Sequence, residues 1–201
     1  MIFTYHTATN RRGFSLVEVL VAISLLLIAL VGPMTYLTRT SQNTEVANQR
    51  VIATFLAQEG IELVHKMRDD AILVGFPAEQ NTRWNNFISQ LNSGGCFTTT
   101  GCSIEISNTG SNGTTTVAAC SGNEPCRLYR RENIGTNRTW YTYTSAGNDL
   151  TPYTRTIRVQ SASESVRELY VTSEVTWRTS TFLRTNRVES TTSVFNIFYE
   201  L

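Results

Sequence analysis

The feature that most constrains this chain is a long apolar run near its N-terminus that contains a single carboxylate. The run extends from Phe14 to Leu37, and no charged residue occurs between Val19 and Val31. A helix over these 24 residues would be about 36 Å long at ~1.5 Å per residue. This length is enough to cross a hydrocarbon core of roughly 30 Å, so the sequence predicts one transmembrane helix.

The residues before the run predict its orientation. Arg11 and Arg12 precede it, and basic residues are retained on the cytoplasmic side of a membrane. We therefore expect a cytoplasmic N-terminus and an external C-terminal domain. The run is too long for a secretory signal peptide and lacks a small-residue cleavage context. An uncleaved signal anchor is the simplest alternative.

Glu18 is the costly residue of this run. A carboxylate in a membrane-length apolar segment costs about 2.5–3.5 kcal/mol and is by default a functional residue with a partner to be found. No basic side chain is available inside the run. The nearest cation would be a backbone amine, which would exist only if the chain were cut before Phe14.

The residues around Glu18 form a specific motif. The string Gly13-Phe14-Ser15-Leu16-Val17-Glu18 resembles the type IV prepilin cleavage and methylation motif. In that family a membrane peptidase cuts after the glycine, here Gly13, and the new N-terminal phenylalanine, here Phe14, is N-methylated. The glutamate at the fifth position of the mature chain, matched by Glu18, pairs with the N-terminal amine of a neighbouring subunit.

This resemblance implies an organisation for the whole chain. It divides the chain into a leader peptide (1–13), a transmembrane and assembly helix (14–37), an amphipathic stem (38–68) and an extracytoplasmic β-rich domain (69–201). The implied partners are a prepilin peptidase, other pilin or pseudopilin subunits, an inner-membrane assembly platform and the lipid bilayer. The implied location is the cytoplasmic (inner) membrane, followed by a pilus or pseudopilus.

The helix is expected to continue beyond the membrane as one nearly continuous element from Phe14 to about Arg68. Proline removes a helical hydrogen bond and clashes with the preceding turn, so a kink is expected at Gly32 and Pro33. Further along, an apolar stripe recurs mostly at three- and four-residue steps and should pack on the globular domain. The stripe consists of Val51, Ile52, Phe55, Leu56, Leu63, Val64 and Met67.

The other residues of the stem have simpler interpretations. Gly60 would allow close packing of the helix. Asp69 and Asp70 are interpreted as a solvated helix terminus, because a calcium site needs about six to eight oxygen ligands and no such spacing follows. The residues expected on the solvated face are Glu59, Glu62, His65 and Lys66.

The remainder predicts an α+β fold in which the long helix packs on a mainly antiparallel, pilin-like sheet. A short helix is expected over Thr82–Leu91. Arg155, Arg158 and Arg178 are assigned to the polar phase of their strands, solvated or paired. The expected strands are Arg127–Glu132, Thr139–Thr144, Thr154–Gln160, Leu169–Trp177 and Arg187–Phe198, with turns at Ile134-Gly135, Thr151-Pro152 and Ser161–Ser165.

Four cysteines in an exported domain favour disulfide bonds. They are Cys96, Cys102, Cys120 and Cys126, and five residues separate the two members of each successive pair. Pairing within each group would close two small loops, and we favour this arrangement. Pairing across the groups would staple a hairpin with arms at 103–106 and 115–118. A zinc site fits poorly, because paired ligands usually lie about two to four residues apart.

Composition weighs against several classes of function. Loss of Arg11 and Arg12 with the leader would leave 15 basic residues against 16 acidic ones, which is no electrostatic footprint for nucleic acid. The two histidines are His6, in the expected leader, and His65. No phosphate loop, nucleophile elbow or metal-ligand cluster occurs. We therefore expect neither an enzyme nor a metal or other cofactor.

Within the resemblance, a minor pilin that is assembled into or primes a type IV pilus is preferred. The cysteines lie in the middle of the domain, whereas many major pilins close a C-terminal loop with a disulfide. A pseudopilin of a type II secretion system is the alternative in the same class. An uncleaved, membrane-anchored adhesive or binding domain is the alternative from another class.

Overall fold

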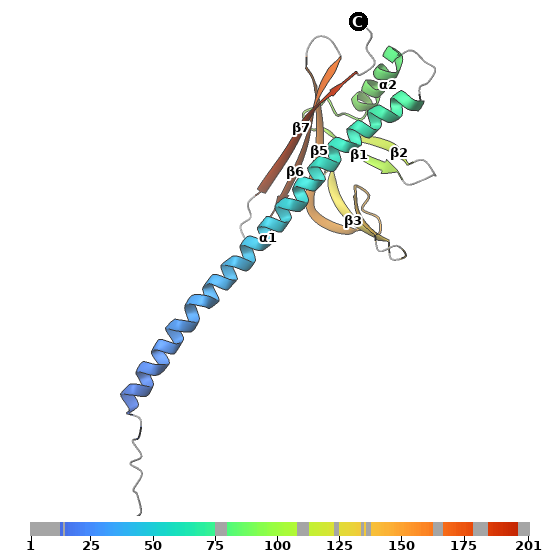
Figure 1. Cartoon of the computed structure of the whole chain (residues 1–201). Helices are drawn as coiled ribbons and strands as arrows, with labels where there is room; N and C mark the ends of the chain where they lie inside the picture. The colour runs from blue at the N-terminus through green and yellow to red at the C-terminus, as the bar shows by residue number, and fades with distance from the viewer. Residues whose placement is uncertain are drawn as a thin grey trace, which may run out of the picture. The chain divides into compact units, whose positions relative to one another are not determined.

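The computed structural model describes residues 13, 15–74, 80–107, 113–122, 125–133, 135, 138–162, 167–178 and 185–196. Two helices, α1 (Leu16–Val74) and α2 (Gln80–Ser93), precede the strands (Figure 1). The strands are β1 (Cys102–Ser107), β2 (Thr114–Ala119), β3 (Arg127–Asn133), β4 (Arg138–Thr142), β5 (Asp149–Ser161), β6 (Glu168–Arg178) and β7 (Thr185–Phe195). The chain divides into two units, Met1–Ala47 and Asn48–Leu201.

The helical part of the first unit is formed by the beginning of α1. The helix is continuous through Gly32 and Pro33, and the predicted kink stays a prediction. Next to the proline, the hydroxyl of Thr35 donates to the carbonyl of Gly32 (2.8 Å) and to that of Val31 (3.2 Å). Such bonds to the preceding turn satisfy a hydroxyl within an apolar helix.

The second unit contains a seven-stranded sheet in which every strand pair is antiparallel. The longest strand, β5, is its centre. It pairs with β6 along Tyr153–Ser161, with β3 at three positions between Asp149 and Thr154, and with β1 at Ile157. The β1–β2 and β3–β4 hairpins therefore contact different parts of β5, and Arg155 lies between the two points of pairing.

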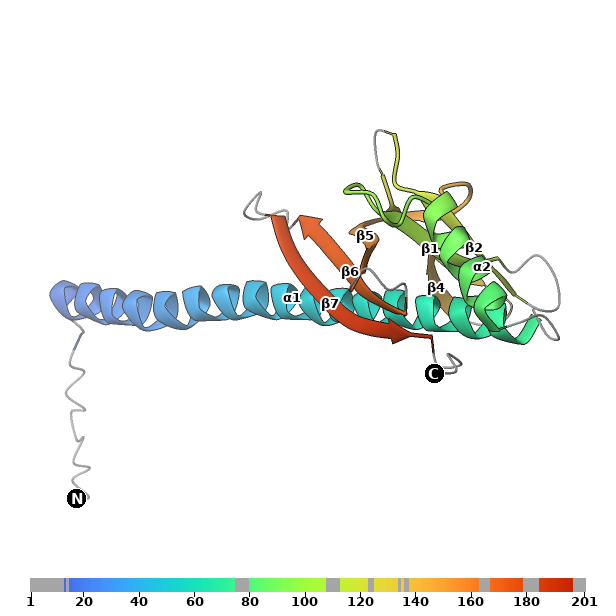
Figure 2. The same ribbon diagram turned by 90° about the horizontal axis from the view of Figure 1, so that it is seen from above.

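The C-terminal part of α1 packs on one face of this sheet, as Figures 1 and 2 show. Alternate residues of β5 and β6 are buried, as the period-two pattern of a half-buried strand requires. Leu169, Val171, Val175 and Trp177 face this core, which confirms the predicted apolar face of the segment. The predicted α+β class, with a long helix on an antiparallel sheet, is thus confirmed.

The apolar stripe of the stem is buried only in part. Leu56, Leu63, Val64 and Met67 lie in the core as predicted. In contrast, Val51, Ile52 and Phe55 are exposed, with 66% of Phe55 accessible. The prediction that they pack on the globular domain is therefore wrong. Ala53 and Ala57 face the sheet instead.

The helix also ends later than predicted, at Val74 rather than near Arg68. Asp69 and Asp70 are therefore not a helix terminus. Each lies beside a basic side chain of the same helix. Lys66 Nζ is 2.5 Å from Asp70 Oδ2, and Arg68 Nη2 is 2.7 Å from Asp69 Oδ1. The Lys66–Asp70 pair has the i, i+4 spacing that stabilises a helix.

The shorter elements agree with the sequence in most places. Helix α2 covers the predicted Thr82–Leu91 and buries Trp84, Phe87 and Leu91. The predicted turn at Thr151-Pro152 is wrong, because both residues lie inside β5. Pairing with β6 begins only at Tyr153, so the proline, which has no N–H, removes no bond to that strand.

Gly60 is the point of closest approach between α1 and the sheet. A Cβ atom added there would lie 3.1 Å from Ser173 Cβ, 3.3 Å from Arg155 Cδ, and still closer to Ser173 Oγ. The predicted role of Gly60 in close packing is therefore confirmed. The glycine lets the helix backbone rest directly on β6.

We expect Gly60→Ala to lower the thermal unfolding temperature of the full chain. The overpacking penalty of about 1–3 kcal/mol exceeds the gain in helix propensity of about 1 kcal/mol. Differential scanning calorimetry measures the effect. Gly32→Ala is the matched control, because its added Cβ would meet no atom within 4 Å. A Gly60→Ala chain as stable as the parent would contradict this account.

Candidate functional site: the N-terminal segment and the buried arginine of the domain

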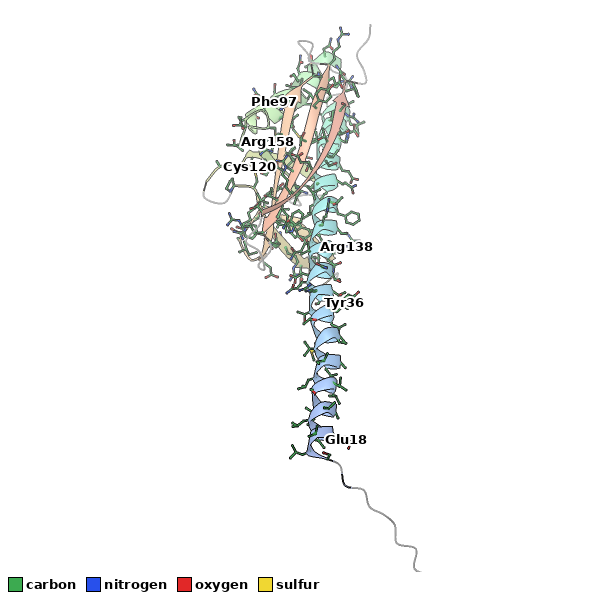
Figure 3. The ribbon with its side chains drawn as sticks, turned by 90° about the vertical axis from the view of Figure 1, so that its left-hand side faces the viewer. Glu18, Tyr36, Phe97, Cys120, Arg138 and Arg158 are labelled. Carbon is green, nitrogen blue, oxygen red and sulfur yellow. A yellow bond between two sulfur atoms is a disulfide. The ribbon has the colours of Figure 1, made fainter. Side chains whose placement is uncertain are left out.

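The predicted assembly residue Glu18 lies at the start of α1, and the predicted processing residue Gly13 precedes the helix. Gly13 is exposed and precedes the helix, Phe14 lies outside the described residues, and the helix begins at Leu16. Glu18 lies in the first helical turn with its side chain exposed (Figure 3). The carboxylate is thus accessible near the end of the helix, close in sequence to the predicted cleavage position.

From Val19 to Leu37 the helix surface carries no charged residue, is mostly apolar, and is uncovered within the first unit. Its large side chains are exposed throughout, and α1 is long and apolar enough to cross a membrane. The hydroxyl of Ser24 donates to the carbonyl of Leu20 (2.9 Å), so this polar group is satisfied within the helix. A helix that is hydrophobic all round is suited to burial in lipid or among other helices.

The cysteines form two short disulfide loops in the domain. Cys96 is bonded to Cys102, and Cys120 is bonded to Cys126. This is the pairing within each group that the sequence analysis favoured. The β1–β2 hairpin forms without a disulfide across it. Cys102 is opposite Ala119, and β1 and β2 pair over six positions.

The domain also contains a buried ionic network that the sequence interpretation missed. The Arg155 side chain is 2% exposed. Its Nη1 donates to Glu59 Oε2 (2.7 Å) and to the Leu56 carbonyl (3.2 Å). Its Nε donates to the Tyr143 hydroxyl oxygen (2.8 Å). These contacts connect α1, β5 and the end of β4, and they satisfy most of the buried guanidinium.

Two sequence assignments are corrected by this network. Arg155 does not occupy the polar phase of β5, because it faces the core together with Tyr153, Ile157 and Val159. Glu59 is not simply part of a solvated helix face, because it is the counter-ion of this arginine. Side chains alternate between the two faces of a strand, and Arg155 is two positions from the buried Ile157. The period of the strand alone therefore predicts that Arg155 faces inward.

Tyr153 provides a test of this core through pH. Burial raises the pKa of Tyr153 to about 12, above the unfolded value of about 10. The folded chain then keeps the proton longer than the unfolded chain. We expect the free energy of unfolding to fall as the pH rises from about 10 to about 12.

Denaturant unfolding at a series of pH values measures this slope. Tyr153→Phe should reduce it, because the titrating group is gone. Tyr170→Phe is the control, since Tyr170 is a half-exposed tyrosine of β6. An equal slope in the parent and the Tyr153→Phe chain would contradict the assignment.

No metal site is apparent in the part of the chain that the structure describes, where no three His, Cys, Asp or Glu side chains are grouped to hold an ion. Burial lowers the pKa of His65, and the nearby Arg68 lowers it further. These effects favour the neutral imidazole, and His65 is half-buried on α1.

Comparison with known proteins agrees with the N-terminal motif. The family model described as the prokaryotic N-terminal methylation motif matches residues 8–32. No curated protein and no solved structure matches the chain. The motif implies processing by a prepilin peptidase and assembly with other pilin subunits, and it points to a structural subunit. Together with the long apolar helix, the matched motif supports a membrane-anchored precursor similar to type IV pilins or pseudopilins.

Proposed function

We propose that this chain is a minor pilin-like subunit that is assembled into a type IV pilus or primes its assembly. A prepilin peptidase would cut between Gly13 and Phe14, after which Phe14 would be N-methylated. Before cleavage the chain would lie in the cytoplasmic membrane with its domain outside. The observation that carries the proposal is the methylation motif at residues 8–32.

In this mechanism, cleavage creates the partner that Glu18 lacks. The new amine of Phe14 on one subunit would pair with the Glu18 carboxylate of a neighbour in the apolar environment between helices. Each group would relieve the desolvation cost of the other. Because Glu18 is exposed in the first turn of α1, such a contact needs no rearrangement of the helix.

The preference for a minor subunit rests on the domain. Its two disulfides, Cys96–Cys102 and Cys120–Cys126, close short loops in the middle of the described domain. Many major pilins instead close a C-terminal loop with a disulfide. The same motif also occurs in pseudopilins, so the machine must be identified by experiment.

A clean deletion of the gene tests the proposal, with surface pili, DNA uptake and protein secretion scored separately. Loss of pili, restored by the parent chain and not by a Gly13 variant that resists cleavage, is the expected result. A secretion defect with normal pili would replace the pilus assignment by a type II secretion pseudopilin. Full restoration by the uncleaved variant would contradict the whole class and favour an anchored binding domain.

A further inference from the structure

A small pocket opens beside the buried arginine, where the β1–β2 and β3–β4 hairpins diverge from β5. Its volume is about 200 Å³. This is below the roughly 300–1,000 Å³ of pockets for drug-sized ligands, so it suits a single small group. Its walls come from α1, β1, β4 and β5, and the lining residues are Glu59, Leu63, Glu105, Ile106, Trp140, Tyr141 and Arg155.

The charges in this pocket do not balance. Arg155 is neutralised by Glu59 at 2.7 Å. The second carboxylate, Glu105, accepts hydrogen bonds from the Thr142 hydroxyl and from the Tyr143 amide (3.4 Å). Among the described residues Glu105 forms no ion pair. A half-buried carboxylate held in place by two neutral donors is left without a counter-ion.

Two aromatic residues also line the pocket. Trp140 and Tyr141 line the pocket from β4, and Arg131 lies over the Trp140 ring with its Cζ 5.5 Å from the centroid. Arg131 itself does not line the pocket. The ring thus already attracts one guanidinium, as the negative face of an indole does. A pocket lined by aromatic residues and by a carboxylate that forms no ion pair among the described residues favours a cation over an anion or a neutral group.

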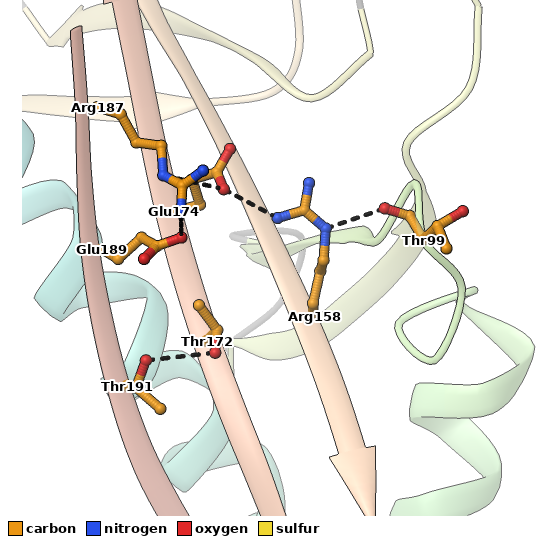
Figure 4. A network of polar contacts seen from close by, with 7 residues as sticks. All are labelled: Thr99, Arg158, Thr172, Glu174, Arg187, Glu189 and Thr191. Carbon is orange, nitrogen blue, oxygen red and sulfur yellow. Dashed lines mark hydrogen bonds and ion pairs between the residues drawn. The ribbon is translucent and has the colours of Figure 1, made fainter.

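The other carboxylates of the sheet provide a contrast. On the face opposite α1, Glu174 lies 3.1 Å from Arg158 and 3.6 Å from Arg187 (Figure 4). Arg187 also pairs with Glu189. In this network each carboxylate pairs with an arginine, so neither carboxylate needs a ligand as its counter-ion. Glu105 differs because it has no cation and lines a pocket.

We propose that this pocket binds one organic cation, an ammonium or guanidinium group, with Glu105 as its counter-ion and with Trp140 and Tyr141 in its lining. The cation could be supplied by a free amine or by a basic side chain of an adjoining protein. The pocket belongs entirely to the second unit. The inference therefore does not depend on filament assembly.

Fluorine NMR of the full chain labelled with 5-fluorotryptophan and purified in detergent tests this proposal. The probes are Nα-acetyl-lysine amide, n-butylamine and the neutral Nα-acetyl-norleucine amide. The lysine probe should shift the Trp140 signal saturably, while the signals of Trp84 and Trp177, each 3% exposed, stay in place. Tighter binding of the lysine probe than of butylamine would identify a protein side chain as the source. Equal binding would identify a free amine.

Two variants connect the binding to the carboxylate. Glu105→Gln should weaken binding of the lysine probe at least about tenfold, because a charged hydrogen-bond partner is removed. Glu189→Gln removes a carboxylate from the opposite face and should leave the affinity unchanged. Calorimetric unfolding of both variants establishes that they are folded.

Three outcomes would overturn the proposal: no saturable shift at Trp140, equal binding of the norleucine probe, or unchanged affinity in folded Glu105→Gln. A further measurement uses the unmodified chain and therefore does not depend on whether the Glu105→Gln variant folds. Raising the sodium chloride concentration from about 0.02 to about 0.5 M shortens the distance over which charges interact. Binding of the lysine probe should therefore become weaker. Affinity that does not change with salt would likewise refute a charge-based site.

Discussion

Glu18→Ala should abolish incorporation of the chain into filaments, while the variant is still inserted in the membrane and cut after Gly13. Removing one member of a buried ion pair costs about 3–5 kcal/mol, which lowers an association constant by about 100-fold or more. The cleavage position lies five residues earlier and does not depend on the partner of the carboxylate. Immunoblotting of sheared filaments and of membranes measures both results.

Ser24→Ala is the matched control for this prediction. Ser24 is a polar residue of the same apolar segment, and its hydroxyl bonds to the carbonyls of Leu20 and Val21 in its own helix. Its removal should leave both processing and assembly unchanged. Normal incorporation of Glu18→Ala into filaments would refute the assembly role of this carboxylate.

Glu59→Ala should destabilise the domain by about 3 kcal/mol, more than Arg155→Met does. Without Glu59 the guanidinium of Arg155 stays buried and loses its counter-ion, which is the costly way to break such a pair. Arg155→Met removes the charge and fills a similar volume, and Glu59, with its side chain 45% exposed, can be hydrated. We expect that variant to cost about 1 kcal/mol.

Urea-induced unfolding of the full chain, followed by near-ultraviolet circular dichroism, measures both free energies. Glu62→Ala is the control, because Glu62 is an exposed carboxylate of the same helix, and its loss should change stability by less than about 0.5 kcal/mol. If Arg155→Met costs as much as Glu59→Ala, the uncompensated charge is not the cause. In that case the arginine contributes mainly by packing.

Local patterns predicted the elements of this fold well. Helical spacing identified the stem, and the alternation of Leu169, Val171, Val175 and Trp177 identified the inner face of β6. These signals succeed because each depends on the period of one element. The turn predicted at Thr151-Pro152 is wrong because a proline is only a local signal for a turn. Here β6 pairs with β5 only from Tyr153 onward, so the strand can continue through the proline. Where a neighbouring strand ends is a tertiary property that the local sequence does not show.

Tertiary contacts account for the other differences. Val51, Ile52 and Phe55 have the spacing of a core face, but the sheet meets the helix at Ala53 and Ala57 instead. The residue types alone do not say which apolar positions another element covers. The disulfide pairing was also open, since the spacing of the four cysteines is compatible with more than one connectivity.

The polar residues were the hardest to place. A charged residue is by default assigned to the solvated side of a strand, and this rule predicts an outward Arg155, although its position relative to Ile157 puts it inward. Its counter-ion Glu59 is 96 positions away in the chain. A pairing over that distance leaves no local signal. The same holds for Glu105 and the hydrogen bonds it receives from the end of β4.

The central claim is that the chain is cut between Gly13 and Phe14 and functions through the new N-terminus. Intact-mass and N-terminal peptide mass spectrometry of the chain, purified from membranes of its own cell, tests this most directly. The account predicts a chain that starts at an N-methylated Phe14 and lacks residues 1–13. A chain that keeps residues 1–13 would contradict it.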